Sequence, residues 1–339
     1  MKNIPVHDAV GMVLCHDVTR IVPGGQKGPA FRKGHIITAR DIAPLLDMGK
    51  ANVYVYDLSE GYIHEDDAAI RIASAAAGPG LRLTSPSEGR VNLTASLNGL
   101  LKVDRETLRE INAVDDVVFA TLHTNIPVDC NQPVGGTRII PLVTLEENIR
   151  QVETICRNRA PVIQVKAILP LRVGIVTTGS EVFNGRIEDK FGPVLHVKFA
   201  ELGCPVAGQV FVSDDPALTA KAIRHFIDEG AEMVAVTGGM SVDPDDQTPT
   251  AIRDTGARVV TYGTPVFPGA MFMLAYLGKV PIIGLPGCVM YHRTSIFDLI
   301  VPRILAGETL SRADFIDLGY GGYCSGCETC AYPRCGFGK

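Results

Sequence analysis

The chain has 339 residues, 46% of them hydrophobic, which is enough apolar sequence for two or three domains with sizeable cores. Its formal net charge of -5 disfavours a general nucleic-acid binder, which would present a basic face. No apolar run reaches the ~18 residues of a membrane span, and the first residues lack the apolar core of a secretory signal. Nine cysteines without such a signal indicate a cytoplasmic protein in a reducing environment, with neither a membrane nor a nucleic acid as partner.

The first half of the chain, residues 1–165, reads as a mixed α/β region. Apolar runs predict strands at Val13–Val22 and Asn52–Tyr56. Helical spacing or helix-start signals predict helices at Thr38–Met48, Ala68–Ala77, Asp104–Asn112 and Leu145–Cys156. The acids of the run His64–Asp67 suit the first turn of the second of these helices. Between them, the alternation of Arg90–Val103 around Asn98-Gly99 predicts a β-hairpin.

Residues 166–310 read as one α/β domain. We predict strands at Leu171–Thr177, Pro205–Val212, Glu232–Thr237, Arg258–Thr261, Phe272–Leu277 and Val280–Gly284. Helices are predicted at Gly192–Leu202, Ala217–Glu229 and Tyr291–Leu305, with one more starting near Asp246. Strands that are apolar throughout and alternate with helices indicate a three-layer fold, in which a parallel sheet is covered on both faces.

Three strand-to-helix turns of this domain combine glycine with hydroxyl side chains. They contain Gly179, Ser180 and Glu181; then Gly238, Gly239 and Ser241; and then Pro286 and Gly287. Glycine lets backbone N–H groups approach a ligand closely, and a helix N-terminus behind each turn favours anions. At the carboxyl edge of a parallel sheet such turns converge on one crevice. The alternative is that each glycine only makes a tight turn; no G-x-G-x-x-G or Walker A pattern is present.

Aspartates follow the second of these turns. Asp243, Asp245 and Asp246 lie just beyond Ser241, where carboxylates beside a phosphate could hold Mg²⁺. The alternative is helix capping, which we favour for Asp214 and Asp215.

In this order the motifs resemble the molybdopterin-binding domain of molybdenum cofactor biosynthesis proteins, over Leu171–Leu305. The resemblance is carried by Val173–Thr178, Gly179-Ser180-Glu181, Asp214-Asp215, Thr237–Ser241, Asp246 with Thr248, Pro268-Gly269 and Leu285-Pro286-Gly287. With its N-terminal region the chain is most similar to the molybdopterin molybdenumtransferases. That likeness implies insertion of molybdate into adenylated molybdopterin with Mg²⁺ and release of AMP. It also implies pterin contacts from the glycines and serines of the three turns and from Pro286, and catalytic or Mg²⁺-holding roles for Asp246, Asp245 and Glu181.

The chain departs from the family at several positions. The transferases carry lysines around the Pro-Gly turn, where this chain has Phe267 and Ala270. Ser180 stands at a position where the family has an acid, and Cys288 at one where it has asparagine. Since lost positive charge weakens stabilisation of an anionic transition state, the alternative is a non-catalytic carrier or sensor of the cofactor, acting with a molybdoenzyme or another pathway protein. A homodimer is a further expectation, because family members are often dimers.

The C-terminal segment 311–339 contains four closely spaced cysteines: Cys324, Cys327, Cys330 and Cys335. Four soft thiolates in one short segment suit Zn²⁺ or an iron–sulfur cluster, and the spacing resembles a ferredoxin run without matching it. Free or disulfide-forming thiols are the alternative. A third interpretation of the whole chain is an unrelated α/β protein with a zinc-binding tail.

Overall fold

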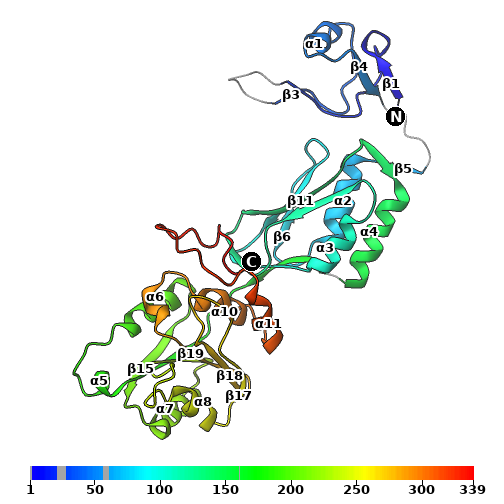
Figure 1. Ribbon diagram of the computed structural model, residues 1–339. Helices are drawn as coiled ribbons and strands as arrows, with labels where there is room; N and C mark the ends of the chain where they lie inside the picture. The colour runs from blue at the N-terminus through cyan, green and yellow to red at the C-terminus, as the bar shows by residue number, and fades with distance from the viewer. Residues whose placement is uncertain (1, 21–27, 56–60, 160) are drawn as a thin grey trace. The chain divides into compact units, whose positions relative to one another are not determined.

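The protein is described by a computed structural model that covers residues 2–20, 28–55, 61–159 and 161–339 (Figure 1). It divides into two compact units, with the main division between Val165 and Lys166. Unit 1 comprises Met1–Leu97, Lys102–Leu122 and Val128–Val165, and unit 2 comprises Asn98–Leu101, His123–Pro127 and Lys166–Lys339. No helix in the described part of the chain combines the length and apolar character needed to cross a membrane.

The centre of unit 1 is an antiparallel sheet in the order β6-β7-β11-β9; two helices, α2 and α3, pack against it, and a third, α4, packs against those two (Figure 1). The strands are β6 Leu81–Leu83, β7 Val91–Ala95, β11 Pro133–Ile139 and β9 Val117–Thr121, and the helices are α2 Glu65–Ala76, α3 Arg105–Asn112 and α4 Glu146–Arg159. Smaller sheets pair β5 Tyr62–His64 with β12 Val143–Leu145, and join β10 Ile126–Val128, β8 Gly99–Val103 and β13 Ile163–Ala167. The predicted mixed α/β character of this region is confirmed.

The N-terminal part of unit 1 has its own small core. Its elements are β1 Lys2–Pro5, η1 Val6–Asp8, β2 Val18–Arg20, β3 Gly28–Phe31, α1 Ile42–Asp47 and β4 Asn52–Val55. The strand predicted over Val13–Val22 is wrong in its first part, because the chain bends before β2 and the Asp17 carboxylate accepts the N–H of Lys33 at 2.7 Å. Residues 21 and 22 of that prediction, and Tyr56 of the strand that became β4, lie outside the described residues.

The predicted hairpin around Asn98-Gly99 is also wrong. β7 pairs with β6 and β11, whereas β8 belongs to the sheet with β10 and β13. The Asn-Gly step therefore connects strands of two sheets. Local turn preference favours a hairpin, but partners far away in sequence take both strand edges.

Unit 2 is built on a six-stranded sheet in the order β15-β14-β16-β19-β18-β17 (Figure 1). Its strands are β14 Val173–Thr178, β15 Val206–Val212, β16 Met233–Thr237, β17 Arg258–Tyr262, β18 Met273–Leu277 and β19 Val280–Leu285. The first four in sheet order are parallel, and β18 and β17 run antiparallel at one edge. The helices are α5 Ser180–Phe183, α6 Phe191–Glu201, α7 Pro216–Asp228, α8 Thr248–Asp254, α9 Cys288–Tyr291, α10 Ile296–Leu305 and α11 Arg312–Ile316, followed by η2 Asp317–Gly319.

The side chains of each central strand alternate between two hydrophobic cores. On β16, Met233 and Ala235 pack in the core that contains α6 and α10, whereas Val234 and Val236 pack in the core that contains α7 and α8. Figure 1 shows these helix pairs on opposite faces of the sheet. The alternation explains why the strands are apolar throughout, and it confirms the predicted three-layer α/β fold.

The long helix predicted over Tyr291–Leu305 is interrupted. A one-turn helix, α9, ends at Tyr291, and α10 starts only at Ile296. Ser295 precedes α10 and forms a capping box with Asp298, whose carboxylate accepts the backbone N–H of Ser295 at 2.8 Å. This reciprocal cap supplies a strong new start and separates the two helices.

Candidate functional site

A pocket of about 520 Å³ opens at the carboxyl ends of β16 and β19 in unit 2. Its walls come from residues 238–241 with Asp246, from residues 267–271, and from residues 285–288. Phe191, at the start of α6, completes the lining. The volume is in the range of small-molecule sites, and its place at the ends of parallel strands is where α/β sheets bind ligands.

Two consecutive glycines form the turn after β16. Gly238 has φ +84° and Gly239 has φ +53°, a region that suits glycine. A Cβ on Gly238 would lie 2.2 Å from the carbonyl oxygen of Thr178 at the end of β14, which is too close for any side chain. Gly238 is thus required by the packing of one strand end against the next, whereas Gly239 is favoured by its left-handed φ.

Thr248, the first residue of α8, orients the two glycine peptides. Its hydroxyl donates to the carbonyl oxygen of Gly238 at 2.8 Å, and its N–H donates to that of Gly239 at 3.1 Å. In a planar trans peptide the N–H points opposite to the C=O. The N–H groups of Gly239 and Met240 therefore point away from Thr248, on residues that line the pocket. The hydroxyl of Tyr262 steadies the same loop, at 2.9 Å from the carbonyl oxygen of Met240.

The turn after β19 is open. Gly287 is exposed, has a helical backbone with φ -53°, and has no atom within 4 Å of the place where a Cβ would stand. Pro286 is buried beside it, and Cys288 is half-buried, which raises the pKa of its thiol. Five of the residues predicted to contact the ligand therefore line this pocket: Pro286, Gly287, Gly238, Gly239 and Ser241.

The turn after β14 does not contribute to the lining of the pocket. Among the described residues that line the pocket, Gly179, Ser180 and Glu181 do not occur. The backbone N–H of Ser180 is already used, because it donates to the Asp214 carboxylate at 2.8 Å. The contribution of this strand end is indirect, through Thr178 beneath the glycine pair.

The acids after β16 differ in their position relative to the pocket. Asp246 lines the pocket, and its carboxylate accepts the N–H of Asp243 at 3.2 Å, whereas Asp245 is exposed and does not line it. Asp215 caps α7 by accepting from Ala217 at 2.7 Å, as the capping alternative predicts. In the described part of the chain no three His, Cys, Asp or Glu side chains gather to hold a metal ion.

The electrostatics of the pocket differ from a phosphate site rich in cations. Among the described residues that line it, Asp246 alone has a charged side chain, and Phe267 and Ala270 occupy the rim. The helices behind the three turns, α5, α8 and α9, have only 4, 7 and 4 residues, so their dipoles are weak. Backbone N–H groups are the positive partners that this pocket offers to an anion.

Sequence reasoning missed Phe191 and Met271 as pocket walls, although it had singled out the neighbouring Pro268-Gly269 turn. Phe191 carried a weak signal: it follows Asp189, whose carboxylate accepts the N–H of Phe191 at 2.9 Å and so starts α6 at the pocket. The four tail cysteines are free thiols in the structure; three are half-buried and Cys327 is exposed.

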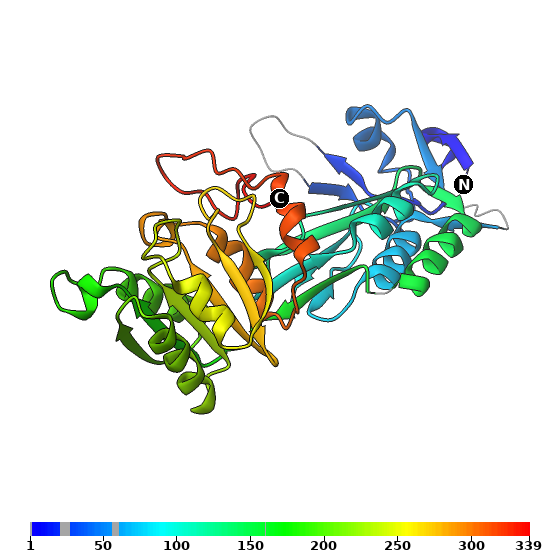
Figure 2. The same ribbon diagram turned by 60° about the horizontal axis from the view of Figure 1, so that its bottom comes forward.

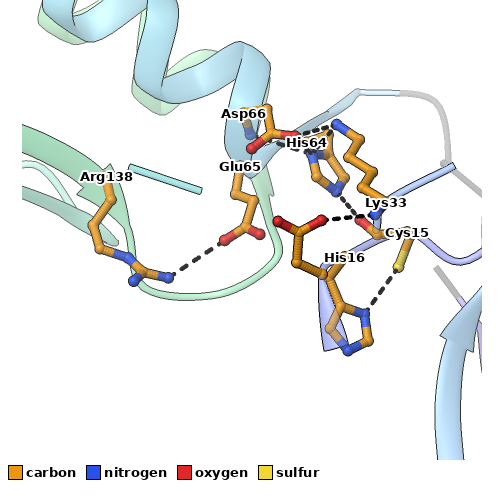
Figure 3. A network of polar contacts seen from close by, with 8 residues as sticks. Cys15, His16, Lys33, His64, Glu65, Asp66 and Arg138 are labelled. Atoms are coloured by element: carbon orange, nitrogen blue, oxygen red, sulfur yellow. Dashed lines mark hydrogen bonds and ion pairs between the residues drawn. The ribbon is translucent and has the colours of Figure 1, made fainter. Parts of the chain in front are cut away.

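Unit 1 contains a second polar cluster, at the junction of β5 and α2 (Figure 3). His64 is 2% exposed; its Nδ1 lies 2.9 Å from the Lys33 ammonium and its Nε2 faces the carbonyl oxygen of Cys15. Burial lowers the pKa of His64, which fits a neutral ring. Lys33 also pairs with Asp66 at 2.6 Å. These bonds tie Cys15 and Lys33 to the start of α2.

Glu65 belongs to the same cluster and was missed as a buried residue. It is 4% exposed, and the Arg138 guanidinium lies 3.4 Å away (Figure 3). Burial, assisted by the nearby Asp66, raises the pKa of Glu65 to about 7. The sequence places Glu65 in the first turn of a helix, and nothing in the neighbouring residues signals that it is buried.

Comparison with known proteins links the pocket to a family. Residues 174–306 match a family model described as "Probable molybdopterin binding domain", and residues 3–57 match a domain of unknown function. A molybdenum cofactor biosynthesis bifunctional protein of Synechococcus elongatus is 26% identical over 168 residues, which are 50% of this chain and 51% of that protein. A CinA-like protein of Mycobacterium sp. is 35% identical over 90 residues, or 26% of this chain and 21% of the relative. The chain thus spans about half the length of the first and a fifth of the second.

Solved structures similar to this chain include two described as MoaB. That of Thermus thermophilus, a molybdopterin biosynthesis enzyme, is 21% identical and covers 41% of this chain and 98% of its own, with a TM-score of 0.33. That of Pyrococcus furiosus, a tungsten cofactor synthesizing protein, is 21% identical and covers 42% and 97%, with a TM-score of 0.34. The fold given above rests on the strand order and packing of this chain itself.

Proposed function

We propose that the pocket at the ends of β16 and β19 binds a molybdopterin, because residues 174–306 match the family model described as "Probable molybdopterin binding domain". The protein would then take part in molybdenum cofactor biosynthesis. The observation that carries this proposal is the pocket itself: every lining residue falls between Phe191 and Cys288, inside the matched segment.

The chemistry of the lining suits a flat heterocycle with an anionic end. Phe267 and Met271 supply apolar surface for a ring system. The N–H groups of Gly239 and Met240, turned away from Thr248, are donors for phosphate oxygens. Such fixed donors bind an anion without the entropy cost of ordering a long side chain.

Binding without turnover is the function that this lining favours. The resemblance to transferases places lysines at the positions of Phe267 and Ala270, and the pocket has an acid as its single charged side chain. Insertion of molybdate passes through an anionic transition state, and losing one preorganised donor costs about 10²–10³ in rate. A carrier or sensor that holds the cofactor needs no such charge.

Molybdate insertion is a second candidate, and Asp246 is the observation that favours it. One pocket carboxylate, together with phosphate oxygens and water, is a common way to hold Mg²⁺. In this case Asp246 would place the metal beside the pterin phosphate.

Two assays separate these functions. In the first, molybdopterin binding is measured for the full chain and for Gly287→Leu, which fills an open position of the pocket without a backbone conflict. Ala217→Leu, at an exposed first-turn position of α7, is the matched control. We expect the Gly287 variant alone to lose binding; if the wild-type protein binds no molybdopterin, the proposal fails.

In the second assay, the protein is incubated with adenylated molybdopterin, molybdate and Mg²⁺, and AMP release is followed. Binding without AMP release above background supports the carrier or sensor. Mg²⁺-dependent release that Asp246→Asn abolishes would instead establish insertion.

A further inference from the structure

The C-terminal tail forms a closed loop (Figure 2). The N–H of Gly338 donates to the carbonyl oxygen of Gly321 at 2.8 Å. A Cβ on Gly321 would lie 2.1 Å from the carbonyl oxygen of Lys339, so the two ends are packed against each other. All four tail cysteines lie between these ends, and the closure confines them to one small region.

One side of the loop is anchored in the core of unit 2. Phe337 is 4% exposed and belongs to the hydrophobic cluster that includes Leu299 of α10. The hydroxyl of Tyr332 donates to the carbonyl oxygen of Asp298 at 3.1 Å, and its ring packs edge-on to Phe337. The tail therefore packs at a defined position against α10.

The other side of the loop borders the pocket. The N–H of Phe267 donates to the carbonyl oxygen of Gly322, and the N–H of Cys324 donates to that of Phe267, both at 2.8 Å. The rings of Phe267 and Tyr323 lie 6.3 Å apart. Because Phe267 lines the pocket, the first cysteine is hydrogen-bonded directly to the pocket rim.

In this structure the four sulfurs have separate surroundings and do not gather at one point. Cys324 and Cys335 pack half-buried against the same core, and the Cys330 sulfur lies 3.2 Å from the Thr294 hydroxyl. Cys327 is exposed at the outer part of the loop. None is consumed in a disulfide, and the two-residue gaps leave enough chain to turn the sulfurs toward one centre.

We propose that Cys324, Cys327, Cys330 and Cys335 together bind a thiophilic metal centre, which is either Zn²⁺ or an iron–sulfur cluster, at the rim of the pterin pocket. The sulfurs converge by rearrangement inside the closed loop, while the anchors at Phe337 and Phe267 stay in place. Since the backbone N–H of Cys324 is hydrogen-bonded to Phe267, metal binding changes the shape of the pocket rim at Phe267 and hence the affinity for the pterin. The metal site stands without the proposed function; only the effect on affinity rests on it.

The test uses the full chain purified anaerobically with reductant. One sample is loaded with Zn²⁺ alone and a second with Fe²⁺, Fe³⁺ and sulfide, and bound metal per chain and the visible spectrum are measured. We expect one arm to give a stoichiometric centre: colourless for zinc, coloured for a cluster. Cys327→Ser removes one of the four ligands and should bind less metal than the wild type. Because Cys327 is exposed, the fold of this variant should be preserved, which circular dichroism checks. Cys130→Ser, an exposed cysteine outside the tail, is the matched control and should bind metal as the wild type does.

Failure of both arms to load the wild type above the level of a variant with all four tail cysteines changed to serine would overturn the metal site. For the effect on the pocket, molybdopterin affinity is compared for loaded and metal-free protein, and we expect about a fivefold difference. Equal affinities reject the coupling to the rim. If neither form binds molybdopterin, the proposed function fails while the metal result stands.

Discussion

Replacing Glu65 with glutamine should remove a pH dependence of stability that burial builds into unit 1. The carboxyl group is 4% exposed, and burial raises its pKa from an ordinary 4.5 to about 7. The folded state therefore prefers the protonated form. Its stabilisation is complete below about pH 4.5 and is lost as the pH rises through about 7.

The magnitude follows from the two pKa values. Between about pH 5 and about pH 8 the wild type should lose about 2.5 kcal/mol of its free energy of unfolding through this one group. Glutamine keeps the shape and does not titrate, so Glu65→Gln should be spared this loss. Denaturant unfolding at both pH values, followed by circular dichroism and by hydrogen exchange of α2, measures the difference.

Glu147→Gln is the matched control, because Glu147 is an exposed acid in the first turn of α4. Its unfolding free energy should follow that of the wild type at both pH values. Subtracting the unfolding free energy of a variant from that of the wild type at each pH cancels the contributions of the other titrating groups. If Glu65→Gln and the wild type lose stability in parallel from about pH 5 to about pH 8, the burial argument is refuted.

Three further substitutions test the structure of unit 2. Gly238→Ala should destabilise it by at least the ~1–2 kcal/mol of a left-handed residue, since the added carbon would also meet a carbonyl oxygen at 2.2 Å. Gly287→Ala should unfold like the wild type, because its backbone is helical and the space is open; equal losses in both variants would contradict this reading. Lys198→Met should cost about 3 kcal/mol by stranding Asp298, whose pKa burial already raises, whereas Lys190→Met at an exposed position should cost nothing measurable in the same denaturation assay.

Agreement between sequence and structure is best where local pattern and long-range packing demand the same thing. The all-apolar run of β16 needs cover on both faces, so a three-layer domain follows from it. Gly238 occupies a position that only glycine fits, and Asp215 caps α7 through its own neighbours. For β16 and Asp215 the decisive features are the period of the strand and contacts between neighbouring residues, and for the glycine turn they include a left-handed backbone that the residue type itself favours.

The disagreements arise where a distant partner decides. Asn98-Gly99 has the local preference of a hairpin, but β7 and β8 pair with other strands. Glu65 has the pattern of an exposed helix start, yet it is buried with Arg138 against it. Neither the pairing of these strands nor the burial of Glu65 can be predicted from the neighbouring residues in the sequence.

From the sequence alone came the parallel α/β domain, its glycine turns and the grouping of four thiols in one short segment, because periodicity and spacing are properties of neighbouring residues. Only the tertiary structure decided that Ser180 spends its N–H on Asp214, that Phe191 closes the pocket, and that the tail seats its first cysteine against Phe267. The physical reason is that these hydrogen-bond partners and pocket walls are far apart in the sequence and come together only on folding. Local sequence patterns therefore do not predict them.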